Sequence, residues 1–196
     1  MRESWFHRRP SEDHGPGCGL ARALSKLGFC SRREAWDLIA AGRVCLNGIV
    51  QRDPERRVAL GQDRIEVNGR AVLRERKVYL MLNKPRGLVT TASDEKGRET
   101  VFQCLAGPAL PFVSPVGRLD KASEGLLLFT NDTAWAAAIT SPESRLEKTY
   151  HVQVDCLADE PLTQRVKRGV TVDSEFLAAQ RADVLRRGTR NSWLEV

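Results

Sequence analysis

Apolar positions at the start of the chain follow helical spacing. Residues 20–27 place Leu and Ala three or four positions apart, which predicts a helix that Gly28 closes. A second helix begins with Ser31 and Glu34, whose spacing is that of a capping box, and this helix is predicted to run to Gly42. The sequence therefore predicts a pair of short helices.

Two Asn-Gly steps follow this helix pair. Asn47-Gly48 and Asn68-Gly69 each separate short apolar runs, a strong signal for a tight hairpin because both residues tolerate positive φ. Residues 20–76 are thus predicted to form a small domain of two helices and several strands. The polar, Gly-rich residues 1–19 are predicted to form a flexible leader.

The pattern changes after the charged segment 74–77. A strand is predicted over residues 78–82, followed by a loop that contains Pro85 and Gly87. Asp132 is a predicted helix N-cap. Further strands are predicted at 88–91, 126–130, 149–154, 169–172 and 178–185, and helices at 100–105, 132–140 and 161–166. Residues 77–196 therefore read as an α+β domain with a mainly antiparallel mixed sheet.

Residues 191–196 read as a strand without a turn or cap after it, so the second domain is predicted to be truncated at its carboxy end. The chain has 196 residues, enough for one or two domains. It contains neither an apolar run long enough to span a bilayer nor a secretory signal at its start. Its five cysteines are scattered and include no Cys-x-x-Cys pair, which favours a reducing cytoplasm and argues against a disulfide framework or a zinc site.

The net charge of +6 is unevenly distributed. Residues 1–78 contain 16 Lys and Arg against 10 Asp and Glu, whereas the remaining residues contain 15 of each. A basic module joined to a neutral one suggests a polyanionic partner, although a solvated basic surface explains the same counts.

The richest segment for chemistry runs from residue 116 to residue 132. Asp120 follows Arg118 and Leu119 in a predicted loop, and an apolar strand comes after it. A carboxylate held at a sheet edge can be aimed as a nucleophile or base, and Arg118 would keep it ionised if the two charges approach. Without further information, Asp120 could equally be a turn or capping residue.

Four ordered segments carry a resemblance to a known family. Gly117-Arg-Leu-Asp120 with the run 124–132 resembles the signature of ribosomal RNA pseudouridine synthases that have an amino-terminal S4-type RNA-binding domain, the RsuA-like branch. The stretch 20–73, the loop 83–87 and Glu147-Lys-Thr-Tyr150 match in order and spacing. The resemblance implies conversion of uridine to pseudouridine in ribosomal RNA or an assembling ribosomal subunit. It implies no cofactor, and a monomer is the simplest expectation.

By resemblance, Asp120 is the catalytic residue and Tyr150 lies against the target base. Asp120 would stabilise a cationic sugar, attack it, or remove a ribose proton, and the sequence leaves these routes open. Arg118 is predicted to fill the space that the everted base vacates or to hold a phosphate, and a role limited to an ion pair with Asp120 is the alternative. The remaining predicted contacts with RNA come from basic residues near the helix pair and in the loop 83–87: Arg22, Lys26, Arg32, Arg33, Arg43, Lys84 and Arg86.

The family continues past the strand that corresponds to residues 192–196 into an Arg-rich motif that completes the active site, and this sequence stops before it. The sequence therefore leaves two classes open: an RNA-modifying isomerase, and a non-catalytic RNA-binding or ribosome-assembly factor derived from that family. A third interpretation, glycosidic hydrolysis by Asp120 and Glu124, has no sugar-binding pattern to support it.

Overall fold

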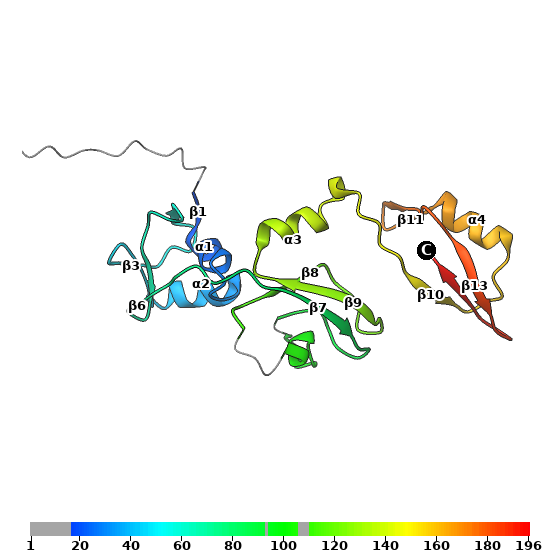
Figure 1. The fold of residues 1–196 in the computed structure, drawn as a ribbon, viewed down its shortest axis with the longest axis horizontal. Coiled ribbons are helices and arrows are strands. Elements are labelled where there is room, and N and C mark those ends of the chain that lie inside the picture. The colour runs from blue at the N-terminus through cyan, green and yellow to red at the C-terminus, as the bar shows by residue number, and fades with distance from the viewer. Residues whose placement is uncertain (1–16, 93, 106–109) are drawn as a thin grey trace, which may run out of the picture. The chain divides into compact units, whose positions relative to one another are not determined.

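The computed structural model describes residues 17–92, 94–105 and 110–196. The chain divides between Ser144 and Arg145 into two compact units (Figure 1), each built from short helices and antiparallel strand pairs, so the α+β prediction is confirmed. Most of the predicted leader lies outside the described residues. Its last two residues form strand β1 (Cys18–Gly19), which pairs with β4 (Arg57–Val58), so these two residues belong to the folded domain and not to a flexible leader.

The predicted helix pair is present as α1 (Leu20–Lys26) and α2 (Arg32–Ala40). The capping box is confirmed: the Glu34 amide donates to Ser31 Oγ at 3.1 Å, and the Ser31 amide donates to Glu34 Oε2 at 2.8 Å. These reciprocal bonds satisfy amide groups that the first helical turn leaves without partners.

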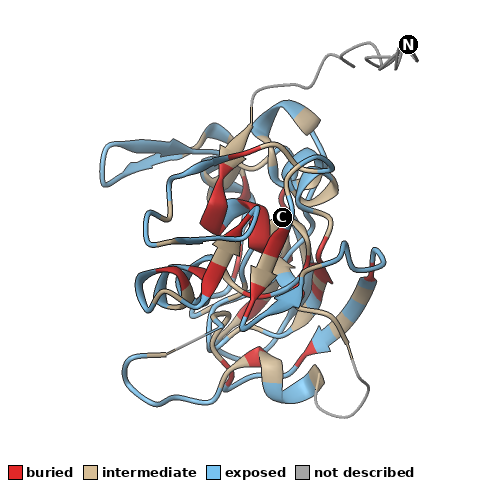
Figure 2. Cartoon of the chain, turned by 90° about the vertical axis from the view of Figure 1, so that its left-hand side faces the viewer, coloured by how far each residue is buried: buried red, intermediate tan, exposed pale blue. Residues whose placement is uncertain are grey.

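Both Asn-Gly hairpins are also confirmed. The four-stranded sheet has the order β3-β2-β5-β6, and each Asn-Gly step joins two neighbouring strands through residues with positive φ. Its strands are β2 (Val44–Leu46), β3 (Ile49–Gln51), β5 (Ile65–Val67) and β6 (Arg70–Ala71). Buried residues of the helix pair and these strands form one core, while the connecting loops are mostly exposed (Figure 2).

A second core in the same unit surrounds a three-stranded sheet with the order β7-β9-β8. Its strands are β7 (Tyr79–Lys84), β8 (Ser114–Val116) and β9 (Gly125–Thr130). The helical segments are η1 (Val101–Leu105), α3 (Thr133–Thr140) and η2 (Pro142–Ser144). Asp132 caps α3 as predicted, since its carboxylate accepts from the Trp135 amide at 3.3 Å. The predicted domain boundary at residues 76 and 77 falls between the two cores and stays a prediction.

The second unit has a three-stranded sheet with the order β10-β14-β13 and a separate hairpin of β11 and β12. The elements are β10 (His151–Val154), α4 (Glu160–Arg168), β11 (Val170–Val172), β12 (Glu175–Leu177), β13 (Asp183–Arg187) and β14 (Ser192–Glu195). Asp159 caps α4 by accepting from the Leu162 amide at 3.0 Å. The predicted strand at the end of the chain is the central strand of this sheet.

Two predicted strands are wrong. Residues 88–91 form only an isolated bridge between Val89 and Thr100, because the chain turns there to meet the loop that contains Asp120. The run 178–185 is not one strand: residues 178–182 form no strand, the Ala179 amide donates to the Val166 carbonyl of α4 at 3.2 Å, and β13 begins only at Asp183. Among the described residues, no helix has the length and apolar character needed to cross a membrane.

Candidate active site

Asp120 lies in the loop that connects β8 to β9, two neighbours in the β7-β9-β8 sheet. Gly117 and Gly125 flank the loop with φ values of 81° and 129°, a region that side-chain-bearing residues rarely adopt. The Ser123 amide donates to the Asp120 carbonyl at 3.0 Å and closes a turn, while the Asp120 side chain is exposed. The hairpin therefore presents the carboxylate to solvent at the edge of the sheet.

Lys84 holds this loop from inside the protein. Its side chain is completely buried, and its ammonium group donates to the carbonyl oxygens of Asp120 at 3.0 Å, Ser123 at 2.8 Å and Pro85 at 3.1 Å. These three bonds use all three donors of the ammonium group. The predicted contact of Lys84 with an RNA phosphate is therefore wrong: β7 continues through Lys84 and directs its side chain inward.

Two more contacts hold the loop on its other side. The Thr90 hydroxyl donates to the Leu119 carbonyl at 2.6 Å, and the Leu119 amide donates back to Thr90 Oγ1 at 3.3 Å. The Gly87 amide donates to the Lys121 carbonyl at 2.7 Å. Together with the Lys84 bonds, these contacts restrain the backbone on both sides of Asp120.

A cleft of about 520 Å³ adjoins Asp120. Charged side chains from the segments 94–98 and 118–121 line it, and Lys96, Arg98, Arg118 and Lys121 supply its positive charges. Within the part of the chain that the structure describes, no ion pair joins Arg118 to Asp120, so Arg118 is available for an external anion.

Asp94 organises the outer wall of this cleft. Its carboxylate accepts from the Arg98 side chain at 2.6 Å and from the backbone amides of Arg98 and Lys96 at 2.8 Å and 3.1 Å. The hydrogen bond from the Arg98 guanidinium, followed by the one from the Arg98 amide, lowers the pKa of Asp94 to about 2. Asp94 is therefore a structural carboxylate that keeps the 94–98 turn closed.

Arg86 lies in the loop after β7, as predicted, and is exposed. It forms an ion pair with Glu124 at 3.3 Å, in which both side chains are well exposed. Exposed pairs of this kind contribute little to stability and exchange partners easily. Arg86 is therefore not committed to Glu124 and is accessible to an external anion.

The other predicted RNA-contacting residues lie in or next to the helix pair. Arg22, Arg32, Arg33 and Arg43 are exposed, whereas Lys26 is half-buried. Arg43 donates to Asn68 Oδ1 at 2.8 Å. Arg33 lies 3.6 Å from Glu95, which links α2 to a residue that lines the Asp120 cleft.

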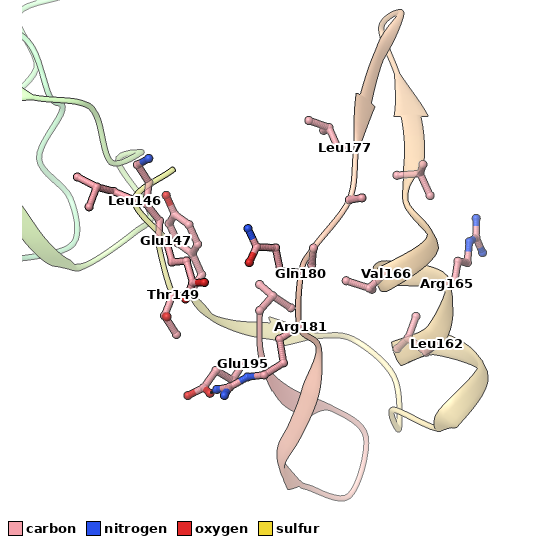
Figure 3. A pocket seen from close by; sticks show the side chains of 16 residues that line it. Leu146, Glu147, Thr149, Leu162, Arg165, Val166, Leu177, Gln180, Arg181 and Glu195 are labelled. Atoms are coloured by element: carbon pink, nitrogen blue, oxygen red, sulfur yellow. The ribbon is translucent and has the colours of Figure 1, made fainter. Parts of the chain in front are cut away.

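Tyr150 belongs to the second unit and is exposed just before β10. Its amide donates to the Val196 carbonyl at 2.8 Å, and the Val196 amide donates back at 2.9 Å, so the ladder between β10 and β14 continues through Tyr150. The residue lines a groove of about 1160 Å³ within this unit. Figure 3 shows the groove between the segment with Leu146 and Thr149 on one side and Leu177, Val166 and Leu162 on the other.

Sequence reasoning missed Thr90, whose hydroxyl contacts the residue before Asp120. No local pattern marks this contact, because its partners lie 29 positions apart. Asp94 and Arg98 were also missed, although an i,i+4 pair of opposite charges next to Gly97 was visible in the sequence.

Comparison with known proteins assigns both halves of the chain. The model of the RNA pseudouridylate synthase family matches residues 78–196, and the S4 domain model matches residues 18–65. An uncharacterized RNA pseudouridine synthase of Rickettsia bellii is 40% identical over 177 residues, covering 90% of this chain and 76% of the relative. The ribosomal large subunit pseudouridine synthase B of Bacillus subtilis is 37% identical over 167 residues, covering 85% of this chain and 67% of that protein.

A solved structure agrees with these matches. The crystal structure of a pseudouridylate synthase superposes with a TM-score of 0.56 at 26% identity and covers 91% of this chain and 76% of that one. The resemblance seen in the sequence is thereby confirmed. The chain belongs to the RNA pseudouridine synthase family and carries an S4 domain ahead of its synthase domain.

Proposed function

We propose that this protein converts a uridine of ribosomal RNA to pseudouridine, with Asp120 as the catalytic carboxylate. The observation that carries the proposal is the geometry of Asp120. Its side chain is exposed beside a cleft of about 520 Å³, while hydrogen bonds restrain the backbone of its loop on both sides. A restrained backbone under an exposed carboxylate suits a group that must meet a reacting atom in a defined orientation.

One well-oriented carboxylate is enough for the isomerisation of uridine. The bond between ribose C1′ and uracil N1 breaks, the uracil turns, and C1′ bonds to C5, which then loses its proton to solvent while N1 gains one. A carboxylate next to C1′ assists each route open to this isomerisation: charge stabilisation, attack on the sugar, or removal of a ribose proton. The reaction needs no redox partner, because its product is an isomer of its substrate.

The proposed roles of the other residues follow from what an everted base requires. Tyr150 is the proposed platform against the target base, since an aromatic ring replaces the stacking that the base gives up on eversion. Arg118 is proposed to fill the vacated space or to hold a phosphate, and Arg86 with the exposed arginines of the helix pair to contact the RNA backbone.

Ribosomal RNA is the proposed partner, free or in an assembling subunit. The relative from Bacillus subtilis is named for the large ribosomal subunit, and the amino-terminal part of this chain is both S4-like and basic. We propose that the protein acts as a monomer in the cytoplasm. The five cysteines are free thiols, which suits a reducing compartment.

The test uses ribosomal RNA transcripts that carry tritium at C5 of uracil. Formation of the C1′–C5 bond releases this tritium to water. We expect release with the parent protein and none with Asp120→Asn. If neither protein releases tritium but both still bind RNA, the protein is a non-catalytic RNA-binding factor and the proposed activity is wrong. Free uracil among the products would instead indicate glycosidic hydrolysis.

A further inference from the structure

Thr90 makes an unusual contact with the loop that contains Asp120. Its hydroxyl both donates to the carbonyl of Leu119, at 2.6 Å, and accepts from the amide of the same residue, at 3.3 Å. Strand β8 ends at Val116, so Leu119 lies beyond its ladder with β9. The Thr90 side chain thus pairs with the Leu119 backbone as a neighbouring strand would.

The backbone around Thr90 is itself restrained. The Val89 amide donates to the Glu99 carbonyl at 3.0 Å, and the Val101 amide donates to the Val89 carbonyl at 3.1 Å. Leu88 and Val101 are both buried in the core of the β7-β9-β8 sheet. Thr90 therefore projects from a fixed base and not from the free end of a loop.

We infer that Thr90 is a positioning residue for Asp120, which it holds in register with the cleft through the backbone of Leu119. The inference rests on the proposed catalytic role of Asp120. Thr90 and Lys84 act on successive residues of the same loop: Thr90 on Leu119, and Lys84 on the carbonyl of Asp120. Without the hydroxyl, Leu119 loses both of these bonds, and the restraints that remain act on Asp120 and on later residues of the loop.

The chemistry of the side chain makes the inference specific. One hydroxyl supplies both the donor and the acceptor that Leu119 requires. Serine keeps both functions, whereas valine keeps the branched shape and has neither. Thr90→Ser and Thr90→Val therefore separate the hydroxyl from the shape of the side chain.

The experiment measures single-turnover tritium release at saturating RNA together with RNA affinity. A displacement of about 1 Å at a reacting group costs up to about 100-fold in rate, so we expect Thr90→Val to slow release by about 10- to 100-fold. RNA affinity should change by less than about threefold, because the missing bond acts on a catalytic group and not on ground-state binding. Thr90→Ser should restore the parental rate to within about threefold, since it retains the hydroxyl.

A matched control is Thr140→Val. The Thr140 hydroxyl donates to the Ala136 carbonyl within α3 at 2.8 Å, and Thr140 does not line the Asp120 cleft. Its replacement should leave the rate unchanged. A parental rate for Thr90→Val, an equal reduction with Thr90→Ser, or a reduction confined to RNA affinity would each overturn the inference.

Amide hydrogen exchange decides the matter independently of activity. Thr90→Val should speed exchange across residues 117–124, whereas Thr90→Ser and Thr140→Val should not, because only the first removes the restraint on Leu119. Unchanged exchange in Thr90→Val would overturn the inference. An inactive parent protein would contradict the proposed function alone, since the exchange result still reports whether Thr90 restrains the loop.

Discussion

Strand β9 is preceded by Asp120 and followed by Asp132, and the two carboxylates differ in their hydrogen bonds. The Asp132 carboxylate, after the strand, accepts from Lys77 Nζ at 2.6 Å, from the Tyr79 hydroxyl at 2.9 Å and from the Trp135 amide at 3.3 Å. The Asp120 carboxylate, before the strand, has no such partner among the described residues, and only its backbone is held. The hydrogen bonds of the protein therefore hold the side chain of Asp132 in a structural role. At Asp120 they hold the backbone and leave the carboxylate accessible for chemistry.

The electrostatics of Asp132 agree with its structural role. The hydrogen bond from Lys77 is the largest of the effects that lower the pKa of Asp132 to about 2, and burial opposes it. The same contact raises the pKa of Lys77, and donation to Asp132 raises the pKa of Tyr79. Asp132 is therefore ionised at neutral pH and committed to its neighbours, which include the first turn of α3.

The largest expected effect is the loss of activity on replacing Asp120, whereas replacing Asp132 should mainly lower stability. Asp120→Asn removes the charged group and should lower tritium release by at least about 1000-fold, as is common when a catalytic side chain is removed, with an unchanged melting temperature. Asp132→Ala removes a helix cap and should cost about 1–2 kcal/mol of unfolding free energy. Tritium release and urea denaturation of both variants check this. A stable, inactive Asp132→Ala protein would break the comparison.

Replacing Lys84 should affect both properties. Lys84→Met leaves the Ser123 carbonyl without its buried donor and the Asp120 carbonyl with the Ser123 amide alone, and an unsatisfied buried acceptor costs about 1–3 kcal/mol. We expect a decrease of about 2 kcal/mol in the unfolding free energy from urea denaturation and a slower single-turnover rate. The control is Lys121→Met, in the same loop but exposed, which should change stability by less than about 0.5 kcal/mol. Equal stability of the two variants would show that Lys84 does not stabilise the loop.

The pH dependence of stability should report on Asp132. Its pKa is lower in the folded protein than in the unfolded chain, so its contribution is complete above the unfolded-state pKa and is lost as pH falls from about 4 to about 2. Asp132→Asn cannot titrate and keeps an oxygen to cap α3, so its melting temperature should fall less steeply over that range. Parallel melting curves for parent and variant would contradict the partners assigned to Asp132.

The smallest expected effect concerns the helix pair. Replacing Arg32 and Arg33 with Ala should weaken binding to many RNAs. The slope of the logarithm of the binding constant against the logarithm of the salt concentration should become shallower by about 0.7–0.9 for each phosphate that the variant no longer neutralises. Arg33 is also paired with Glu95, so Arg32→Ala alone should account for most of the change. Arg70→Ala, on the exposed strand β6, is the control. Binding measured at several salt concentrations checks this, and an unchanged slope would take both arginines out of the interface.

Local signals explain what could be predicted. The capping box at Ser31, the Asn47-Gly48 turn and the cap at Asp132 each depend on residues at most three positions apart, and all three form as expected. The loop position of Asp120 also followed from neighbouring residues. The predicted strand at 88–91 failed: only Val89 forms a bridge, with Thr100, and the Thr90 side chain contacts Leu119, 29 positions later in the chain.

Lys84 shows what only the tertiary structure decided. In the sequence it is a basic residue beside a Pro-Gly loop, a natural contact for RNA, but the fold buries it completely against carbonyl groups that lie 36 and 39 positions later. The sequence alone indicated the family, most of the helices and strands, and the candidate carboxylate, because these depend on motifs and short-range spacing. Which side chains hold the Asp120 loop depended on contacts between distant segments, and those exist only once the sheet has paired.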